Sequence, residues 1–243
     1  MHELHLAVLI DADNVPHAYV KEMLEEISKD GTPTIKRIYG DWTKPTVSGW
    51  KNVLLENAIT PIQQYGYTTG KNSTDNAMII DAMDILYSGK VDGFCIVSSD
   101  SDYTRLATRL REAKMKVIGI GERKTPKPFI AACNKFIYIE ILRTPVSKDG
   151  ATQTAAGNKE ALSRIDPALI KLLAESAADL ADESGWTHLG GLGHHILKNK
   201  ADFDPRNYGF EKLLPLIKST GRFDVDERET PNKNVKIVYI KAK

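Results

Sequence analysis

The chain has 243 residues, of which 33 are lysine or arginine and 32 are aspartate or glutamate, and its formal net charge is +1 at pH 7. This length exceeds one typical domain and provides material for two cores, whereas the balanced charge indicates no particular class of partner. No apolar run approaches the roughly 18 residues of a membrane span, so we expect no membrane segment.

The chain contains only two cysteines, Cys95 and Cys133. Both lie in apolar sequence surroundings and lack the spacing of a metal site or a disulfide framework, which is typical of a reducing compartment. The first strand signal begins near Leu4 and leaves no room for a signal peptide before it. We therefore predict a cytoplasmic protein with buried, inert thiols.

The first 145 residues alternate between strand and helix signals. Helical spacing of apolar residues occurs, for example, at Val20, Leu24 and Ile27. Such alternation predicts an α/β domain in which a parallel sheet lies between two layers of helices. The predicted strands cover residues 4–10, 34–39, 91–97, 116–120 and 136–142.

The composition changes after this region. Residues 146–163 are rich in Ser, Thr, Gly, Ala, Asn and Lys and contain almost no large apolar residue. This composition is typical of a flexible connector. We predict a linker over 146–163 that joins a first domain, 1–145, to a second domain, 164–243.

The second domain carries three helix signals followed by two strand signals. Apolar residues at helical spacing mark the helices, and strands are expected at 223–225 and 235–240, joined by a polar loop at 226–234. Three short helices and a terminal hairpin form a winged-helix arrangement, with the hairpin as the wing. The helix markers are Leu169, Leu173 and Leu180, then Leu189, Leu192 and Ile196, then Phe210, Leu213, Leu214 and Ile217.

Acids follow two of the buried strands of the first domain. One strand leads into Asp11, Asp13 and Asn14, and another leads into Asp100 and Asp102. The carboxyl ends of such strands border the ligand crevice of an open parallel sheet, so both clusters point to one edge. Single acids in these places are often helix caps or turn formers, but their joint occurrence favours a functional site.

Asp75 joins this set because of its helical phase. At 100° per residue it lies on the apolar stripe continued by Met78 and Ala82, so we expect it in the first turn of a helix, on the inward side. Asp81 and Asp84 point elsewhere around the same helix, and we expect them to be structural or solvated.

The gathered acids predict a divalent-metal site. Asp11, Asp75, Asp100 and Asp102 would repel one another unless a cation lay among them, since an unpaired buried charge costs several kcal/mol. Carboxylate oxygens suit Mg²⁺ or Mn²⁺, whose remaining positions are taken by water and substrate phosphate. We therefore expect these four acids to act as metal ligands and as the catalytic residues.

One enzymatic alternative remains open. Residues 11–15, DADNV, satisfy the DxDx[TV] spacing of haloacid-dehalogenase-type phosphatases, in which Asp11 would be the nucleophile and Asp13 the acid/base. This hypothesis explains fewer residues, because such enzymes do not require Asp75. The chain has no Walker-type phosphate loop, and its Gly119-Ile120-Gly121 lacks the third glycine of a dinucleotide fingerprint.

Four motifs of the first domain together resemble those of the NYN domain. They are LIDADNV at 9–15, KNSTD at 71–75, VSSDSDY at 97–103 and VIGIG at 117–121, and the resemblance spans roughly residues 1–142. It implies a PIN-like fold and metal-dependent ribonuclease activity. It also places the family's metal-binding acids at Asp11, Asp75, Asp100 and Asp102, with Asn14 and Ser99 as supporting polar residues, and leaves the role of Asp13 open.

The second domain is similar to the LOTUS domain, also called OST-HTH, over about residues 165–241. The similarity is carried by GWTHLGGLG at 185–193, by FDPRNYGFEKLL at 203–214 and by Phe223. It implies a winged helix associated with RNA binding and, in some members, with binding a protein. These glycines and aromatic residues are typical of the fold, and they support the prediction of the fold better than the prediction of its ligand.

Basic residues supply candidate contacts to RNA phosphates. A cluster follows the second acidic motif, and others lie in the second domain. The residues that we predict to bind RNA are Lys71, Arg105, Arg109, Arg123, Lys124, Lys198, Lys212 and Lys233.

The sequence thus predicts a cytoplasmic, divalent-metal-dependent ribonuclease with a winged-helix RNA-binding module. A non-enzymatic alternative is an RNA-binding adaptor whose nuclease fold no longer cuts, although the presence of all four acids argues against it. A protein partner for the second domain is a further possibility that the sequence leaves open.

Overall fold

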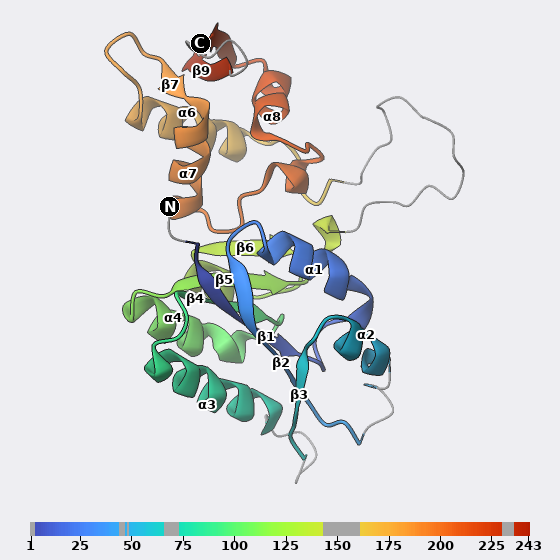
Figure 1. Ribbon diagram of the computed structural model, residues 1–243. Coiled ribbons are helices and arrows are strands. Elements are labelled where there is room, and N and C mark those ends of the chain that lie inside the picture. The colour runs from blue at the N-terminus through green and yellow to red at the C-terminus, as the bar shows by residue number, and fades with distance from the viewer. Residues whose placement is uncertain (1–2, 44–46, 48, 66–72, 143–160, 230–235) are drawn as a thin grey trace, which may run out of the picture. The chain divides into compact units, whose positions relative to one another are not determined.

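The computed structural model describes residues 3–43, 47, 49–65, 73–142, 161–229 and 236–243 (Figure 1). The chain divides into two compact units, Met1–Pro145 and Val146–Lys243. Each unit has its own hydrophobic core.

A six-stranded parallel sheet forms the centre of the first unit. Its strand order is β3-β2-β1-β4-β5-β6, so the two strands that precede acids, β1 and β4, are neighbours. Their register places Ile10 beside Val97. The strands are β1 (His5–Asp11), β2 (Thr32–Gly40), β3 (Thr60–Gln63), β4 (Gly93–Val97), β5 (Lys116–Gly121) and β6 (Lys135–Tyr138).

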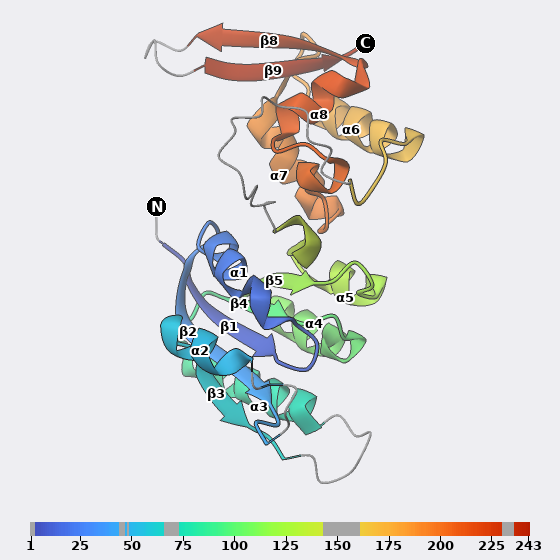
Figure 2. The ribbon, with the colours of Figure 1, turned by 90° about the vertical axis from the view of Figure 1, so that its right-hand side faces the viewer.

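Helices cover both faces of this sheet, as the alternation predicted (Figures 1 and 2). Alternate residues of β1 enter different cores: Val8 and Ile10 pack with α1 and α2, whereas Ala7 and Leu9 pack with α3, α4 and α5. Because both faces of β1 are buried, its sequence is a continuous apolar run rather than an alternation of apolar and polar residues. The helices are α1 (Val20–Ile27), α2 (Trp50–Glu56), α3 (Ser73–Ser88), α4 (Thr104–Glu112) and α5 (Lys127–Ala132).

The structure adds elements that the sequence did not predict and shortens one that it did. Strand β3 was missed because it has four residues, includes Pro61 and lies at the sheet edge, where a missing N–H is tolerated. Helices α2 and α5 are short and were also missed. The predicted strand 136–142 ends at Tyr138, because a 3-10 turn, Ile139–Ile141, follows.

The described part of the second unit contains three α-helices and a small antiparallel sheet, consistent with the predicted winged helix. Its sheet has the order β7-β9-β8, and Leu173, Leu192 and Ile240 lie in its core. The strands extend beyond the predicted ranges, and the third helix begins at Leu213 rather than at Phe210. The elements are α6 (Pro167–Asp179), β7 (Thr187–His188), α7 (Leu189–Asn199), α8 (Leu213–Thr220), β8 (Phe223–Glu229) and β9 (Lys236–Ala242).

Most of the predicted linker, 146–163, lies outside the described residues. Its last residue, Ser163, donates a backbone hydrogen bond of 2.8 Å to the carbonyl oxygen of Asn207. This residue is therefore attached to the second unit.

Candidate metal centre

The candidate site lies where the chain direction diverges between β1 and β4. After β1 the chain continues to α1 on one face of the sheet, and after β4 it continues to α4 on the other face. Such a switch point leaves a crevice at the carboxyl ends of the strands. Asp11 is the last residue of β1, and Ser98 follows β4 directly.

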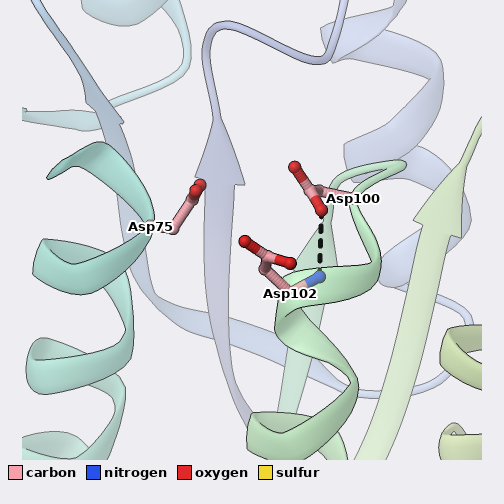
Figure 3. A group of neighbouring side chains, drawn as sticks. All are labelled: Asp75, Asp100 and Asp102. Carbon is pink, nitrogen blue, oxygen red and sulfur yellow. Dashed lines mark hydrogen bonds between the residues drawn. The ribbon is translucent and has the colours of Figure 1, made fainter. Parts of the chain in front are cut away.

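Three carboxylates meet at this crevice. One oxygen from each of Asp75, Asp100 and Asp102 lies within 4.8 Å of the others (Figure 3). We call these three residues the acidic trio. Asp75 comes from the first turn of α3. Asp102 lies in a 3-10 turn, Ser101–Tyr103, that leads into α4, and Asp100 directly precedes that turn.

The 3-10 turn has a local reason in the sequence. Asp100 is its N-cap, and its Oδ1 accepts a hydrogen bond of 2.9 Å from the backbone N–H of Asp102. Asp100 therefore acts as a helix cap, the role that single acids at strand ends often have. Capping uses one oxygen of Asp100 and leaves the other for a ligand, so capping and metal binding are compatible here.

Asp11 is not part of the acidic trio in the described structure. Its side chain is almost fully buried, with 1% exposed. Its Oδ2 accepts hydrogen bonds from Asn14 Nδ2 at 2.6 Å and Ser98 Oγ at 3.0 Å, and its Oδ1 accepts one from the N–H of Asp13 at 3.1 Å. The predicted role of Asp11 as a metal ligand stays a prediction, and its observed contacts tie the end of β1 to the end of β4.

Two residues that the sequence analysis did not single out organise these acids. The buried Tyr103 hydroxyl donates to Asp75 Oδ1 at 2.7 Å and lies 3.4 Å from Asp11 Oδ2. Ser98 Oγ, besides donating to Asp11, accepts a hydrogen bond of 3.1 Å from the N–H of Asp100. Both residues belong to the motif VSSDSDY. Ser98 is a polar residue directly after a buried strand, which was an available signal, whereas the strand pattern gave no signal for Tyr103.

The surroundings of Asp75 and Asp11 disfavour the charged form of both carboxylates when no cation is bound. Burial, and to a lesser extent the neighbouring carboxylates of Asp100, Asp102 and Asp13, raise the pKa of Asp75, although the Tyr103 hydrogen bond opposes this. Burial also raises the pKa of Asp11. A cation would relieve both effects, and an all-oxygen donor set with one exposed member fits Mg²⁺ or Mn²⁺ that retains water.

Without metal, we expect the charge of Asp75 to destabilise the fold. Since its folded-state pKa is raised, stability falls as pH rises from the ordinary aspartate range through the raised pKa. Asp75→Asn keeps an acceptor for Tyr103 and should raise the Tm of the chelator-treated protein at pH 7 by about 2–4 °C. Thermal melts between pH 4 and 8 test this, with the exposed Asp84→Asn as control; equal melts for wild type and Asp75→Asn would contradict it.

The predicted supporting residues have different positions. Asn14 binds Asp11, as described above, whereas the hydroxyl of Ser99 accepts a hydrogen bond of 2.8 Å from the N–H of Glu122. Ser99 therefore holds the loop after β5 beside the 3-10 turn. Asp13 is exposed and accepts a hydrogen bond of 3.5 Å from Thr74 Oγ1, next to Asp75.

The described residues of the first unit that were predicted to bind RNA lie on α4 and in the loop after β5. Arg105 is exposed in the first turn of α4, near the acidic trio in the chain, and Arg123 and Lys124 are exposed in the loop that Ser99 holds. Arg109 lies in the last turn of α4 and its guanidinium contacts the Tyr87 hydroxyl at 3.4 Å, so it is not brought to the acids. Lys71 lies outside the described residues.

In the second unit, Lys198 is exposed in the last turn of α7, and Lys212 is the exposed N-cap residue of α8. Lys233 lies outside the described residues. Two basic side chains of the described wing strands are paired with acids: Lys236 lies 3.8 Å from Glu227, and Arg228 lies 2.8 Å from Asp226. Lys241 donates instead to the Ser184 carbonyl at 3.0 Å.

Family models match the chain in two places. The model of the NYN domain matches residues 5–140. The chain belongs to the NYN domain family. An OST-HTH/LOTUS domain matches residues 160–235, after the NYN domain, which confirms the order predicted from the sequence. An NYN domain implies a PIN-like nuclease fold, and an OST-HTH/LOTUS domain implies RNA binding.

Several solved structures are similar to the chain, among them the following two. An uncharacterized protein from Nitrosomonas europaea is 34% identical, with 40% of this chain and 90% of that chain covered and a TM-score of 0.32. A protein of unknown function from Vibrio parahaemolyticus is 19% identical, with 57% and 94% covered and a TM-score of 0.48. No curated protein matches the chain. Within the described residues of the NYN protein, no helix has the length and apolar character needed to cross a bilayer.

Proposed function

We propose that the protein is a divalent-metal-dependent ribonuclease that hydrolyses RNA phosphodiester bonds. The acidic trio at the switch point of an NYN domain is the observation that carries this proposal. The presence of an OST-HTH/LOTUS domain in the same chain supports RNA as the substrate. The two buried free cysteines are compatible with a reducing compartment, so we place the enzyme in the cytoplasm.

The residues divide the work by position. Asp75, Asp100 and Asp102 would hold Mg²⁺ or Mn²⁺, which supplies an activated water and neutralises charge on the phosphate. Tyr103 keeps Asp75 oriented through its 2.7 Å hydrogen bond, and Asp11 links the ends of β1 and β4 through its hydrogen bond to Ser98. Arg105 on α4 and Arg123 in the loop after β5 are exposed and would supply positive charge for neighbouring phosphates, and Lys124, which is paired with Glu122, would add to it.

The structure argues against the phosphatase alternative. A nucleophilic carboxylate must reach the phosphorus, but Asp11 is 1% exposed and its Oδ2 accepts hydrogen bonds from Asn14 and Ser98. That mechanism also does not require Asp75, which lies with Asp100 and Asp102 in the acidic trio. The adaptor alternative predicts that RNA is bound but not cut.

The direct test is incubation of the full chain with end-labelled single-stranded RNA. We expect cleavage with Mn²⁺ or Mg²⁺ and none after chelation with EDTA. Uncut RNA at saturating metal would contradict the ribonuclease, and metal binding measured by calorimetry would then separate an inactive centre from an adaptor that has lost the centre.

The winged-helix domain should raise the affinity for long RNA. If residues 146–163 act as a flexible tether, binding at the second domain makes binding at the acidic trio intramolecular. Removal of residues 164–243 leaves a unit with its own cores and should therefore increase KM for long RNA far more than it lowers kcat.

Short oligonucleotides that cannot reach both domains serve as the control, and the truncated chain should cut them almost unchanged. Binding of long RNA by the full chain should also weaken steeply with salt, because phosphate contacts release counterions. If truncation leaves the kinetics on long RNA unaltered, the second domain serves a protein partner instead.

A further inference from the structure

One face of the small sheet in the second unit carries aromatic side chains. Tyr239 of β9 is paired in register with His188 of β7, and side chains of directly paired residues share one face of a sheet. Trp186 lies two positions before His188 and therefore points to the same face. The neighbouring pair, Thr187 and Ile240, is buried and points the opposite way, toward the helices.

The hydrophobic core of this unit does not use these aromatic residues. It contains three others, Phe203, Tyr208 and Phe223. Within the described residues, Trp186 and Tyr239 are only half-buried and belong neither to this core nor to the partly buried side chains packed against it. A tryptophan that served the fold alone would be packed in the core, so the position of Trp186 indicates a different role.

Arg228 of β8 places a planar cation over these rings. Its guanidinium carbon lies 4.1 Å from the centroid of the Tyr239 ring and 5.7 Å from that of Trp186. Its Nε donates to Asp226 Oδ2 at 2.8 Å, yet the Arg228 side chain is still 43% exposed. The rings of His188 and Tyr239 are also neighbours, with centroids 5.7 Å apart. We call Trp186, His188, Arg228 and Tyr239 the aromatic face.

A tight turn fixes Trp186 at the edge of this face. Asp182 Oδ1 accepts hydrogen bonds from the N–H of Ser184 at 2.9 Å and from the N–H of Trp186 at 3.0 Å. Gly185 has a φ of 82°, in the left-handed region that favours glycine. Lys241 Nζ donates to the Ser184 carbonyl at 3.0 Å and ties the turn to β9. The aromatic face is therefore pre-organised, which lowers the entropy cost of binding a ligand.

The chemistry of the aromatic face fits a nucleobase better than a cation. Aromatic rings attract cationic side chains, but Arg228 already occupies the ring of Tyr239 that such a group would use. A guanidinium plane backed by aromatic rings is a stacking surface for a flat, neutral group, and RNA bases stack on both kinds of side chain. The OST-HTH/LOTUS domain that this unit matches implies RNA binding, so such a ligand is at hand.

We propose that the aromatic face binds a base of single-stranded RNA by stacking on Arg228 and the rings behind it. This inference rests on the proposed RNA substrate and adds a contact to it. The contact selects no base identity, because every base has a π-face. It also differs from the lysine contacts on α7 and α8, which would be made to phosphates and would weaken with salt.

The test measures the Kd of the full chain for a labelled, mixed-sequence single-stranded RNA by anisotropy, in EDTA, at several salt concentrations. Tyr239→Ala removes a ring, and Arg228→Lys keeps the charge but removes the plane. Each should weaken binding by about 5- to 100-fold without changing the slope of log Kd against log salt. Lys198→Ala should instead reduce that slope by about 1. Tyr239→Phe, which keeps the ring, and Lys171→Ala, an exposed position on α6, are the matched controls and should bind as the wild type does.

Tryptophan fluorescence gives a readout that a purely structural role would not change. Of the three tryptophans of the chain, Trp186 alone lies in the second unit. RNA should quench part of the emission of the wild type, and this quenching should be lost in Trp186→Phe. Thermal melts establish that each variant is folded; should Tyr239→Ala unfold, Arg228→Lys and Trp186→Phe still decide.

The outcomes separate this proposal from the ribonuclease. If the full chain binds RNA but the affinities of these variants and the quenching are unchanged, the aromatic face is not an RNA site and serves a protein partner instead. If the full chain binds no RNA, the aromatic face also fails. In both cases the cleavage of short oligonucleotides with Mn²⁺ decides the ribonuclease independently, because it does not depend on the second unit.

Discussion

Asp100→Asn should reduce metal-dependent RNA cleavage by at least about 100-fold, a loss larger than that expected for a residue that only supports a ligand. The substitution removes one negative charge from the acidic trio without changing the side-chain volume. Asn can still accept the N–H of Asp102, so the 3-10 turn should remain. The measurement is kcat/KM on labelled single-stranded RNA in Mn²⁺.

The control is Asp84→Asn on α3, which removes an equal charge from an exposed position outside the acidic trio. Circular dichroism and thermal melts should show both variants folded. If purified Asp100→Asn cuts RNA at the wild-type rate, the assignment of the trio as the catalytic centre is wrong.

Tyr103→Phe should weaken Mn²⁺ binding by about 10- to 100-fold. Phenylalanine keeps the buried ring and removes the hydroxyl that donates to Asp75. Because that hydrogen bond lowers the pKa of Asp75, its loss should shift the pH midpoint of Mn²⁺ binding upward. Calorimetric titration of metal at several pH values measures both effects, and the Asp75→Asn variant should no longer show the shift.

Tyr39→Phe is a matched control inside the same domain. Tyr39 is equally buried, and its hydroxyl donates to a different carboxylate of α3, Asp81. Both substitutions leave a carboxylate without one donor and should cost similar stability, about 1–3 kcal/mol. Only Tyr103→Phe should change metal affinity; an equal loss in both variants would mean that Tyr103 acts through general stability.

The sequence predicted the layers of the first domain because its strands are continuous apolar runs that enter two cores. The same reasoning missed β3, since Thr60-Pro61-Ile62-Gln63 is too short and too exposed to carry that signal. Helical phase placed Asp75 on the inward side of α3, and the structure brings it to Asp100 and Asp102. The metal they would bind stays a prediction.

The depth of each acid could not be predicted from the strand pattern. The register pairs Ile10 with Val97, so Asp11 is level with Ser98, whereas Asp100 lies beyond the strand end on a cap. Sequence position shows which edge an acid approaches but not how far it projects. The same limit hid Tyr103, whose hydroxyl reaches back from the turn to Asp75.

The pairing of β1 with β4 also determines when this centre can exist during synthesis. Asp11 and Ser98 are 87 positions apart in the chain, yet they share a hydrogen bond in the finished fold. Long-range parallel pairing is slow to form and must wait until both strands have left the ribosome. A nascent chain that ends before β4 has Asp75 of the trio on α3 but lacks Asp100 and Asp102, and we expect such fragments to leave RNA intact, including the messenger that is being translated.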